Sequence, residues 1–215
     1  AHMVLYRFLF AMVPLAPLLF THRPHLNRRE WGVLLVTSFL GVPLQFLLQF
    51  YGLSMTTVSH AALMFGTMPV ILAVGATIFA HERMDRTGWI AMATSTCGAA
   101  LIALGGRHAG SSSLTGDLLI VASLFIALFW ILFNKQLMER HSHIVITTYG
   151  LALGTAMLMI WVPLQYGLPP VAHLSLKVWM ALAGSGLLCT ATSTLLWNWG
   201  LTQVPASQAG VLLNM

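Results

Sequence analysis

The sequence predicts an all-α protein that crosses a membrane several times, and its composition and the spacing of its apolar residues carry this prediction. Of the 215 residues, 58% are hydrophobic and only 7% are charged, and the mean hydropathy is +0.83. A soluble domain has about 25% charged residues. The apolar residues fall in blocks of roughly 18–24, and about 20 helical residues span the hydrocarbon core of a bilayer. Membrane-spanning strands would be about half as long and would alternate.

We expect seven complete membrane-spanning helices and the start of an eighth. The complete ones cover about 3–20, 32–53, 58–79, 88–105, 117–137, 144–167 and 177–201, and the last begins near 207. Charged residues, prolines and glycines mark the breaks, as in THRPHLNRRE, HERMDRTG, GGRHAGSSSLTG, MERHSH and LPPVAHLS. The chain therefore reads as helices joined by short loops, with one flexible linker at 106–116.

The basic residues predict which way the chain faces. Seven of them flank the loops after the first, third and fifth helices: Arg23, Arg28, Arg29, Arg83, Arg86, Lys135 and Arg140. Only Arg107 and Lys177 lie on the other side. The positive-inside rule places the first set in the cytoplasm, and we expect an integral protein of a bacterial inner membrane. The pI near 9.8 then reports orientation, and no nucleic-acid partner is expected.

Two stretches of the chain repeat one another 148 positions apart. The aligned pairs include Trp31 with Trp179, Gly52 with Gly200 and Ser59 with Ser207. We expect a first repeat over 1–105, the linker 106–116 and a second repeat over 117–215. The same shift predicts one helix before residue 1 and, after residue 215, the rest of the helix that begins near 207 and one further helix, which makes ten in all. Five helices per repeat would invert the second copy, as in secondary transporters.

Three stretches also carry a family resemblance. They are YRFLFAMVPLAPLL, GLSMTTVSHAALMFGTMPVILAVGATIFAHERMDRTGWIAMATSTCGAALIAL and WNWGLTQVPASQAGVLLNM. The second has a small-residue turn, then Pro69 within a helix, then Glu82 and Arg83 at the helix exit. Together they resemble the EamA-type drug/metabolite transporter superfamily over essentially the whole chain. The resemblance implies a ten-helix bundle of two inverted five-helix repeats around a central cavity, with cytoplasmic termini, moving small solutes by alternating access.

Polar and small residues recur at helical spacing on three of the expected helices. They are Ser38, Gly41, Gln45, Gln49 and Gly52, then Gly186, Cys189, Ser193, Trp197 and Gly200, and then Ser123, Ala127, Trp130 and Asn134. Lipid offers amide side chains no hydrogen-bond partner, so these stripes should face protein or water. We interpret Gln45, Gln49, Trp130, Asn134, Ser193 and Trp197 as lining a substrate cavity. Helix packing is the alternative, above all for the small residues.

Arg7 and His60 complete the candidate substrate-binding residues. An arginine near a helix centre costs roughly 2.5–3.5 kcal/mol on insertion scales, and its planar fork suits a carboxylate. An arginine that reaches toward the outer interface is the alternative. Histidine changes charge near neutral pH, so His60 could couple to protons, and a helix-capping or interfacial role is its alternative. Asp117 and Glu82 are assigned to helix ends alone.

The motifs of soluble enzymes are not found in this sequence, which has no HExxH, GxxxxGK[ST], GxGxxG or CxxC. Cys97 and Cys189 read as buried small residues, and neither a metal site nor a cofactor is expected. We predict a secondary-active or facilitative transporter, not an enzyme, that exports or exchanges small amino-acid-like metabolites. Its partners would be a small-molecule substrate and membrane lipids, with proton coupling and oligomeric state left open. A membrane-embedded enzyme or a non-transporting scaffold on the same fold is the alternative.

Overall fold

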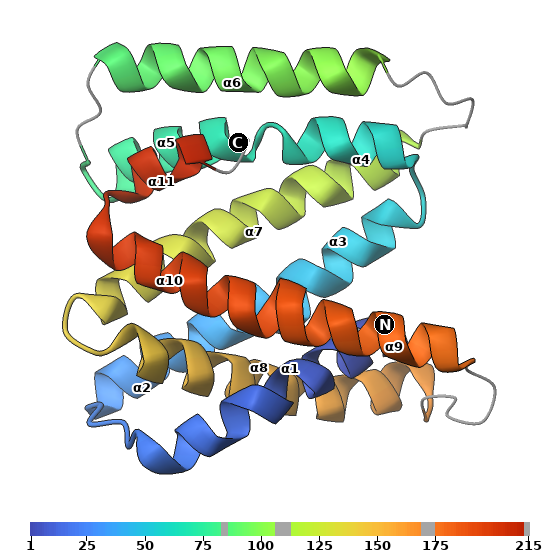
Figure 1. The fold of residues 1–215 in the computed structure, drawn as a ribbon, viewed down its shortest axis with the longest axis vertical. Helices are drawn as coiled ribbons and strands as arrows, with labels where there is room; N and C mark the ends of the chain where they lie inside the picture. Colours follow the sequence, from blue (N-terminus) through green and yellow to red (C-terminus); the bar gives the residue numbers. More distant parts are fainter. Residues whose placement is uncertain (83–85, 106–112, 169–174, 213–215) are drawn as a thin grey trace. The chain divides into compact units, whose positions relative to one another are not determined.

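The computed structural model describes residues 1–82, 86–105, 113–168 and 175–212, and within these ranges the chain forms helices and no strand (Figure 1). The helices are α1 (His2–Thr21), α2 (Arg28–Phe39), η1 (Leu40–Leu44), α3 (Gln45–Leu53), α4 (Val58–Phe65), α5 (Met68–Phe79), α6 (Arg86–Gly105), α7 (Leu114–Met138), α8 (His143–Tyr166), α9 (Leu176–Gly186), η2 (Leu187–Thr192), α10 (Ser193–Gln203) and α11 (Ala206–Leu212).

Six of the helical spans in the described residues are long and apolar enough to cross a membrane. They are His2–Thr21, Arg28–Leu53, Ser59–Phe79, Leu114–Met138, His143–Tyr166 and Leu176–Gln203. The expected helix at 88–105 is present as α6, although it is not among these six. The predicted polytopic helical membrane protein is thus confirmed. Most of the expected linker, 106–112, lies outside the described residues.

The expected third helix is divided into α4 and α5. A turn at 66–67 separates them, and Pro69 follows in the first turn of α5. Proline has no N–H to donate and its fixed φ suits a helix start. Thr57 begins α4, because its side chain accepts a hydrogen bond from the backbone N–H of His60.

The chain forms two compact units, and each draws on both ends of the sequence. Unit 1 comprises Ala1–Leu47 and Phe133–Thr202, and unit 2 comprises Leu48–Leu132 and Gln203–Met215. The repeat boundaries expected from the sequence follow a different division, and they stay a prediction.

In unit 1, α1 packs against α8, α9 and η2, and α8 also packs against α2 and η1. Asn27 and Glu30 form a capping box that starts α2. The Tyr149 hydroxyl on α8 donates a hydrogen bond to the carbonyl of Leu19 at 2.9 Å. Gly154 of α8 lies so close to Val42 of η1 that a Cβ there would be 2.5 Å from it. The small residues of α8 therefore serve packing within the unit.

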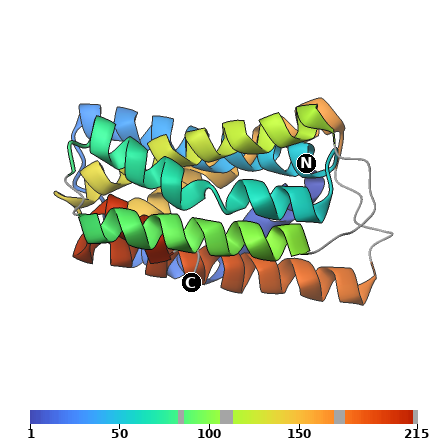
Figure 2. The same ribbon diagram turned by 90° about the horizontal axis from the view of Figure 1, so that it is seen from above.

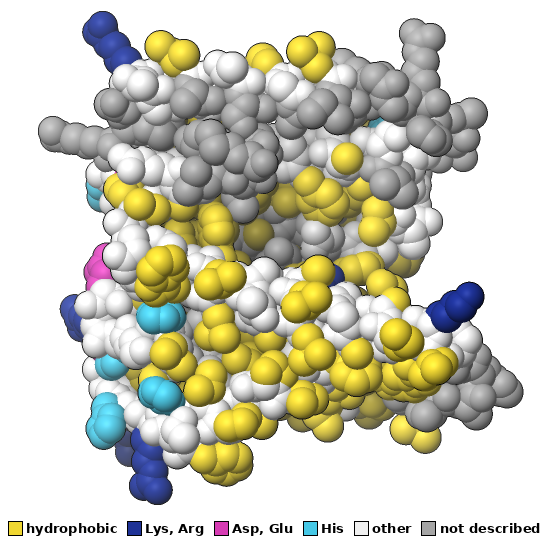
Figure 3. Space-filling model, viewed as in Figure 1, with side chains coloured by type: hydrophobic (Ala, Val, Ile, Leu, Met, Phe, Trp, Pro, Cys, Tyr) yellow, Lys and Arg dark blue, Asp and Glu magenta, His cyan; other side chains and the backbone are white. Residues whose placement is uncertain are grey.

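The surface of unit 1 has an apolar face along its helices and a basic region at one end. Exposed large apolar side chains stand on α9, η2 and α10, among them Met180, Leu188, Leu196 and Trp199. Figure 3 shows hydrophobic side chains over this face, and arginines and histidines at the end where α1 leads into α2. Apolar flanks and charged ends are what helices crossing a bilayer require.

Two π-helical turns interrupt the long helices of unit 1 at aligned positions. Adding 148 to 40–44, the residues of η1, gives 188–192, and η2 covers 187–192. The helices that precede them start at Arg28 and Leu176, also 148 residues apart. π-turns are rare in α-helices and are frequent at functional sites. A duplicated unit would place them in this way.

In unit 2, α11 packs against α5 and α6, and α4 packs against α6. Figures 1 and 2 both show α5 (teal) beside α6 (green). Close backbone approaches hold α3 to α7, since a Cβ on Gly52 would lie 2.8 Å from the Gly116 carbonyl oxygen.

Glu82 has a role that the sequence did not indicate. Its carboxylate accepts hydrogen bonds from the backbone N–H groups of Ala206 and Ser207, at 3.0 and 2.9 Å, and from the Ser207 hydroxyl at 2.8 Å. Pro205 precedes α11 and has no side-chain acceptor for these groups. The glutamate is therefore the cap of α11, and its charge suits the positive end of the helix.

Cys97 and Cys189 are exposed. The expectation that both are buried small residues is therefore wrong. At Cys189 the cause is the π-turn, because wider turns move residues away from the face that a 3.6-residue period predicts.

Candidate functional site

Arg7 of α1 lies at the centre of a polar network with η2. Its Nε donates a hydrogen bond to Thr190 Oγ1 at 2.6 Å, and its Nη2 donates to the Cys189 carbonyl oxygen at 3.3 Å. The Ser193 hydroxyl donates to the same carbonyl at 2.6 Å. The guanidinium also stands over the Phe46 ring, 5.3 Å from its centroid. The predicted site residues Arg7 and Ser193 are thus brought together.

The partners of Arg7 place its charged group at the middle of a membrane span. The span Leu176–Gln203 has 28 residues, and Cys189 and Thr190 are its two central ones. In its own helix, Arg7 is the sixth residue of the span His2–Thr21. The choice between an arginine that binds a substrate carboxylate and one that reaches toward the outer interface stays a prediction.

The charge of Arg7 has no acidic partner among the residues that the structure describes. A hydroxyl, a backbone carbonyl and an aromatic face surround it instead. Of the five N–H donors of a guanidinium, these bonds use two. Ionisable residues within a membrane mark substrate or ion pathways by default. The remaining donors can bind an anion, most favourably a carboxylate in bidentate geometry.

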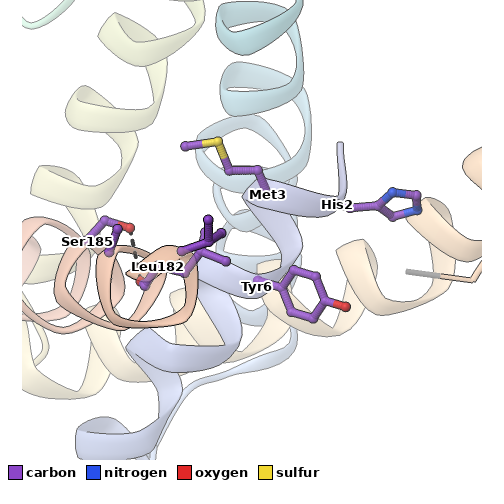
Figure 4. A pocket seen from close by; sticks show the side chains of 7 residues that line it. His2, Met3, Tyr6, Leu182 and Ser185 are labelled. Atoms are coloured by element: carbon purple, nitrogen blue, oxygen red, sulfur yellow. Dashed lines mark hydrogen bonds between the residues drawn. The ribbon is translucent and has the colours of Figure 1, made fainter. Parts of the chain in front are cut away.

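An apolar cavity of about 460 Å³ lies between α1 and α9, and Tyr6, the residue before Arg7, lines it. Its lining residues are His2, Met3, Tyr6, Val178, Ala181, Leu182 and Ser185. Figure 4 shows Met3 and Tyr6 on α1 with Leu182 and Ser185 on α9. The Ser185 carbonyl accepts a hydrogen bond from Thr190 Oγ1 at 3.2 Å, which links the cavity wall to the Arg7 network.

The packing of α1 on η2 depends on a glycine at the end of α9. A Cβ on Gly186 would lie 2.5 Å from the carbonyl oxygen of Arg7 and 2.6 Å from the Cβ of Phe10. Only glycine lets the α1 backbone come this close. Gly186 therefore helps to bring the Arg7 side chain within reach of Thr190.

Gln45 and Gln49 stand one turn apart at the start and middle of α3. The side-chain oxygen of each is buried and has no hydrogen-bond partner among the described residues. A buried amide oxygen that accepts no hydrogen bond costs free energy, so a substrate N–H group or a water that donated to either oxygen would be bound favourably. Both glutamines remain candidates on this ground.

The other predicted site residues do not join the Arg7 network. Asn134 is buried on α7, and Trp197 is half-buried on α10. Trp130 is half-buried in the part of α7 that belongs to unit 2. None of the hydrogen bonds in the described part of the chain joins these three residues to Arg7. Their role in substrate binding stays a prediction.

His60 of unit 2 is paired with an acid. Its Nδ1 lies 3.2 Å from Asp117 Oδ2, and the Thr56 hydroxyl donates to Asp117 Oδ1 at 2.5 Å. The His60 side chain is 44% exposed and that of Asp117 is 17% exposed. Asp117 therefore has a role beyond that of an acid in the first turn of α7, because its hydrogen bonds tie the start of α7 to the turn before α4.

Sequence reasoning missed Thr190 and Phe46. The 3.6-residue period put Cys189 on the inner stripe, whereas the π-turn buries Thr190, which is 2% exposed. Phe46 adjoins Gln45 and reads as one apolar residue among many. No sequence pattern marks a π-turn, so nothing in the sequence distinguished either residue.

The sequence of this chain is similar to those of proteins named as transporters. The sequence profile of the EamA-like transporter family matches residues 1–104 and 114–215. The uncharacterized transporter YetK of Bacillus subtilis (strain 168) is 28% identical over 220 residues, covering 97% of this chain and 65% of YetK. An uncharacterized transporter of Archaeoglobus fulgidus is 24% identical over 218 residues, covering 100% of this chain and 74% of its own length.

A solved crystal structure, 17% identical in sequence, superposes with a TM-score of 0.80 over 99% of this chain and 73% of that one. At this identity the likeness shows the fold alone.

Proposed function

We propose that this chain, which belongs to the EamA-like transporter family, moves small amphipathic carboxylates such as amino-acid-like metabolites across the membrane. Transport is by export or exchange and proceeds by alternating access between the two sides. The family and the relatives named as transporters support solute transport. The surroundings of Arg7 support a substrate that carries a carboxylate.

The single observation that carries the substrate class is that Arg7 bonds to the middle of the span Leu176–Gln203 and has no acidic partner among the described residues. Among the described residues its donors meet a hydroxyl and a carbonyl, which leave its charge uncompensated. A substrate carboxylate supplies the missing charge and can accept two N–H bonds at once. A neutral solute of the same shape leaves the charge as it was, so it binds less well.

The apolar part of the substrate has a place in the cavity between α1 and α9. Its volume of about 460 Å³ suits a small molecule, and its wall is chiefly aliphatic and aromatic. Tyr6 contributes a buried hydroxyl with no partner among the described residues, which can meet one polar group of the solute. The oxygen of Gln45 is an acceptor suited to an ammonium group. Gln49, Trp130, Asn134 and Trp197 are proposed to line the path.

The arrangement in the membrane is also part of the proposal. The chain spans a bacterial inner membrane with the loops after the first, third and fifth predicted helices in the cytoplasm, following the positive-inside rule. Two inverted repeats over 1–105 and 117–215 are proposed. The aligned π-turns support the duplication, and five helices per repeat would invert the second copy.

Solute or ion gradients are proposed as the energy source. The sequence contains no ATP-binding motif of the GxxxxGK[ST] type. Proton coupling has a candidate in the His60–Asp117 pair, which combines a histidine with a carboxylate at 3.2 Å.

The test is solute flux in proteoliposomes that contain the full-length protein. A panel would pair each carboxylate with its uncharged amide, and each pair would be measured with and without a pH gradient. We expect flux of apolar amino-acid-like carboxylates and little flux of the amides. Flux of the amides alone would refute the substrate class. No flux from folded, inserted protein would refute transport and favour a scaffold.

A further inference from the structure

We propose that Thr190 is a positioning residue for Arg7: it holds the guanidinium by Nε, so that the Nη groups are presented to a substrate carboxylate. This inference rests on the proposed function and deepens it, because it names the residue that sets the preference for anions. Thr190 itself does not touch the substrate.

The geometry of the Thr190 hydroxyl suits this task. Its oxygen accepts from Arg7 Nε at 2.6 Å, and its proton goes to the Ser185 carbonyl oxygen at 3.2 Å. Both sides of the hydroxyl are thus occupied, and its orientation is fixed. The side chain is buried, with 2% exposed, so water does not compete for either bond. With Nε on Thr190 and one N–H of Nη2 on the Cys189 carbonyl, the other N–H of Nη2 and both N–H groups of Nη1 stay free at the end of the guanidinium.

The π-turn explains why the acceptor stands at this position. The partner of the Thr190 hydroxyl is the carbonyl five residues earlier, that of Ser185 near the end of α9. Thr192 makes the same kind of bond, to the Leu187 carbonyl at 3.0 Å. Thr190 faces α1 and Thr192 is exposed. The two threonines are therefore equal in local bonding, and only one of them meets Arg7.

Unit 1 also contains an apolar version of the same helix crossing. The position 148 residues before Thr190 is Val42 of η1, and α8 packs against η1 as α1 packs against η2. There Gly154 meets Val42 directly. The aligned mate of Arg7 is Thr155, whose hydroxyl bonds to its own helix at the Leu151 carbonyl. Since the second crossing packs without an arginine, the polar link between Arg7 and Thr190 is not required to join a helix to a π-turn.

The experiment compares Thr190→Val, which removes the acceptor and keeps the shape, with Thr192→Val as the matched control and Thr190→Ser as the rescue. Uptake of a carboxylate and of its amide would be measured in proteoliposomes. We expect Thr190→Val to raise KM for the carboxylate about tenfold, as expected for losing a hydrogen bond to a charged group. KM for the amide should hardly change, and Thr190→Ser should restore the wild-type values.

A structural role would act differently. If Thr190→Val lowers Tm and impairs carboxylate and amide equally, the positioning role is wrong. Equal KM values for Thr190→Val and Thr192→Val would also overturn it.

A second readout separates this inference from the proposed function. In protein labelled with ¹⁵N-arginine, the Arg7 Nε–H signal is assigned by its loss in Arg7→Lys. We expect its exchange with water to speed up in Thr190→Val and to stay slow in Thr192→Val, whether or not a transported solute is found. Unchanged exchange in Thr190→Val would overturn the inference, while absent flux with the expected exchange would refute only the proposed function.

Discussion

Replacing Gly186 by alanine tests whether the close approach of α1 to η2 is needed at the site. The added Cβ would lie 2.5 Å from the Arg7 carbonyl oxygen, and ordinary contact begins at 3.4 Å. The α1 backbone would have to retreat by about 0.9 Å (3.4 − 2.5). A shift of that size along the Arg7–Thr190 hydrogen bond lengthens it from 2.6 Å to about 3.5 Å, at the limit for such a bond.

Two opposing terms set the effect of Gly186→Ala on stability. Overpacking of a tight interface costs ~1–3 kcal/mol, whereas alanine in place of glycine favours a helix by ~1 kcal/mol. The net destabilisation is then about 0–2 kcal/mol. The loss of the hydrogen bond to a charged group adds about a tenfold rise in KM for the carboxylate. A tenfold change corresponds to about 1.4 kcal/mol, so binding should suffer about as much as folding.

Gly184→Ala is the control, because no atom lies within 4 Å of a Cβ built there. It keeps the helix-propensity gain and has no clash, so we expect a small rise in Tm and an unchanged KM. The assay is thermal unfolding in detergent together with carboxylate uptake in proteoliposomes. If the two alanine variants behave alike in both measurements, the reasoning about the close approach is refuted.

Three further variants test other contacts. Glu82→Gln weakens the cap of α11 by ~1 kcal/mol and should speed hydrogen exchange of its first amides; unchanged exchange would contradict the capping role. Asp117→Asn and His60→Gln should show a coupling of ~0.2–1 kcal/mol in a double-mutant cycle of thermal unfolding, since the histidine is partly exposed; additive effects would argue against the pair. Asn198→Leu leaves Thr147 without its 2.7 Å hydrogen bond and should cost ~1–3 kcal/mol, most of it recovered when Thr147→Val is added; no recovery would contradict this account.

Most of the helices could be predicted because membrane spans are long and their apolar runs are continuous. The start of the predicted second helix differs from α2 by a few residues, since the capping box at Asn27 and Glu30 already organises the chain there. The third helix was predicted as one, although the turn at 66–67 divides it. An apolar run shows how far a span extends, and it hides an interruption that neighbouring helices support.

The candidate site could be predicted only in part. Arg7 stood out because a charge in an apolar run is costly wherever it lies. Its partners Cys189 and Thr190 are more than 180 residues away in sequence, and the π-turn that presents them follows no 3.6-residue period. The pairing of His60 with Asp117 and the capping of α11 by Glu82 are likewise long-range contacts. Local patterns identify such side chains and do not pair them.

The most direct test of the central claim is the ratio of carboxylate to amide uptake by proteoliposomes with wild-type protein and with Arg7→Gln, each shown to be folded and inserted. Arg7→Lys, which keeps the charge and loses the fork, is the intermediate case. We predict a strong preference of the wild type for the carboxylate, its loss in Arg7→Gln and partial retention in Arg7→Lys. A wild-type preference in Arg7→Gln would contradict the claim that Arg7 binds the substrate carboxylate.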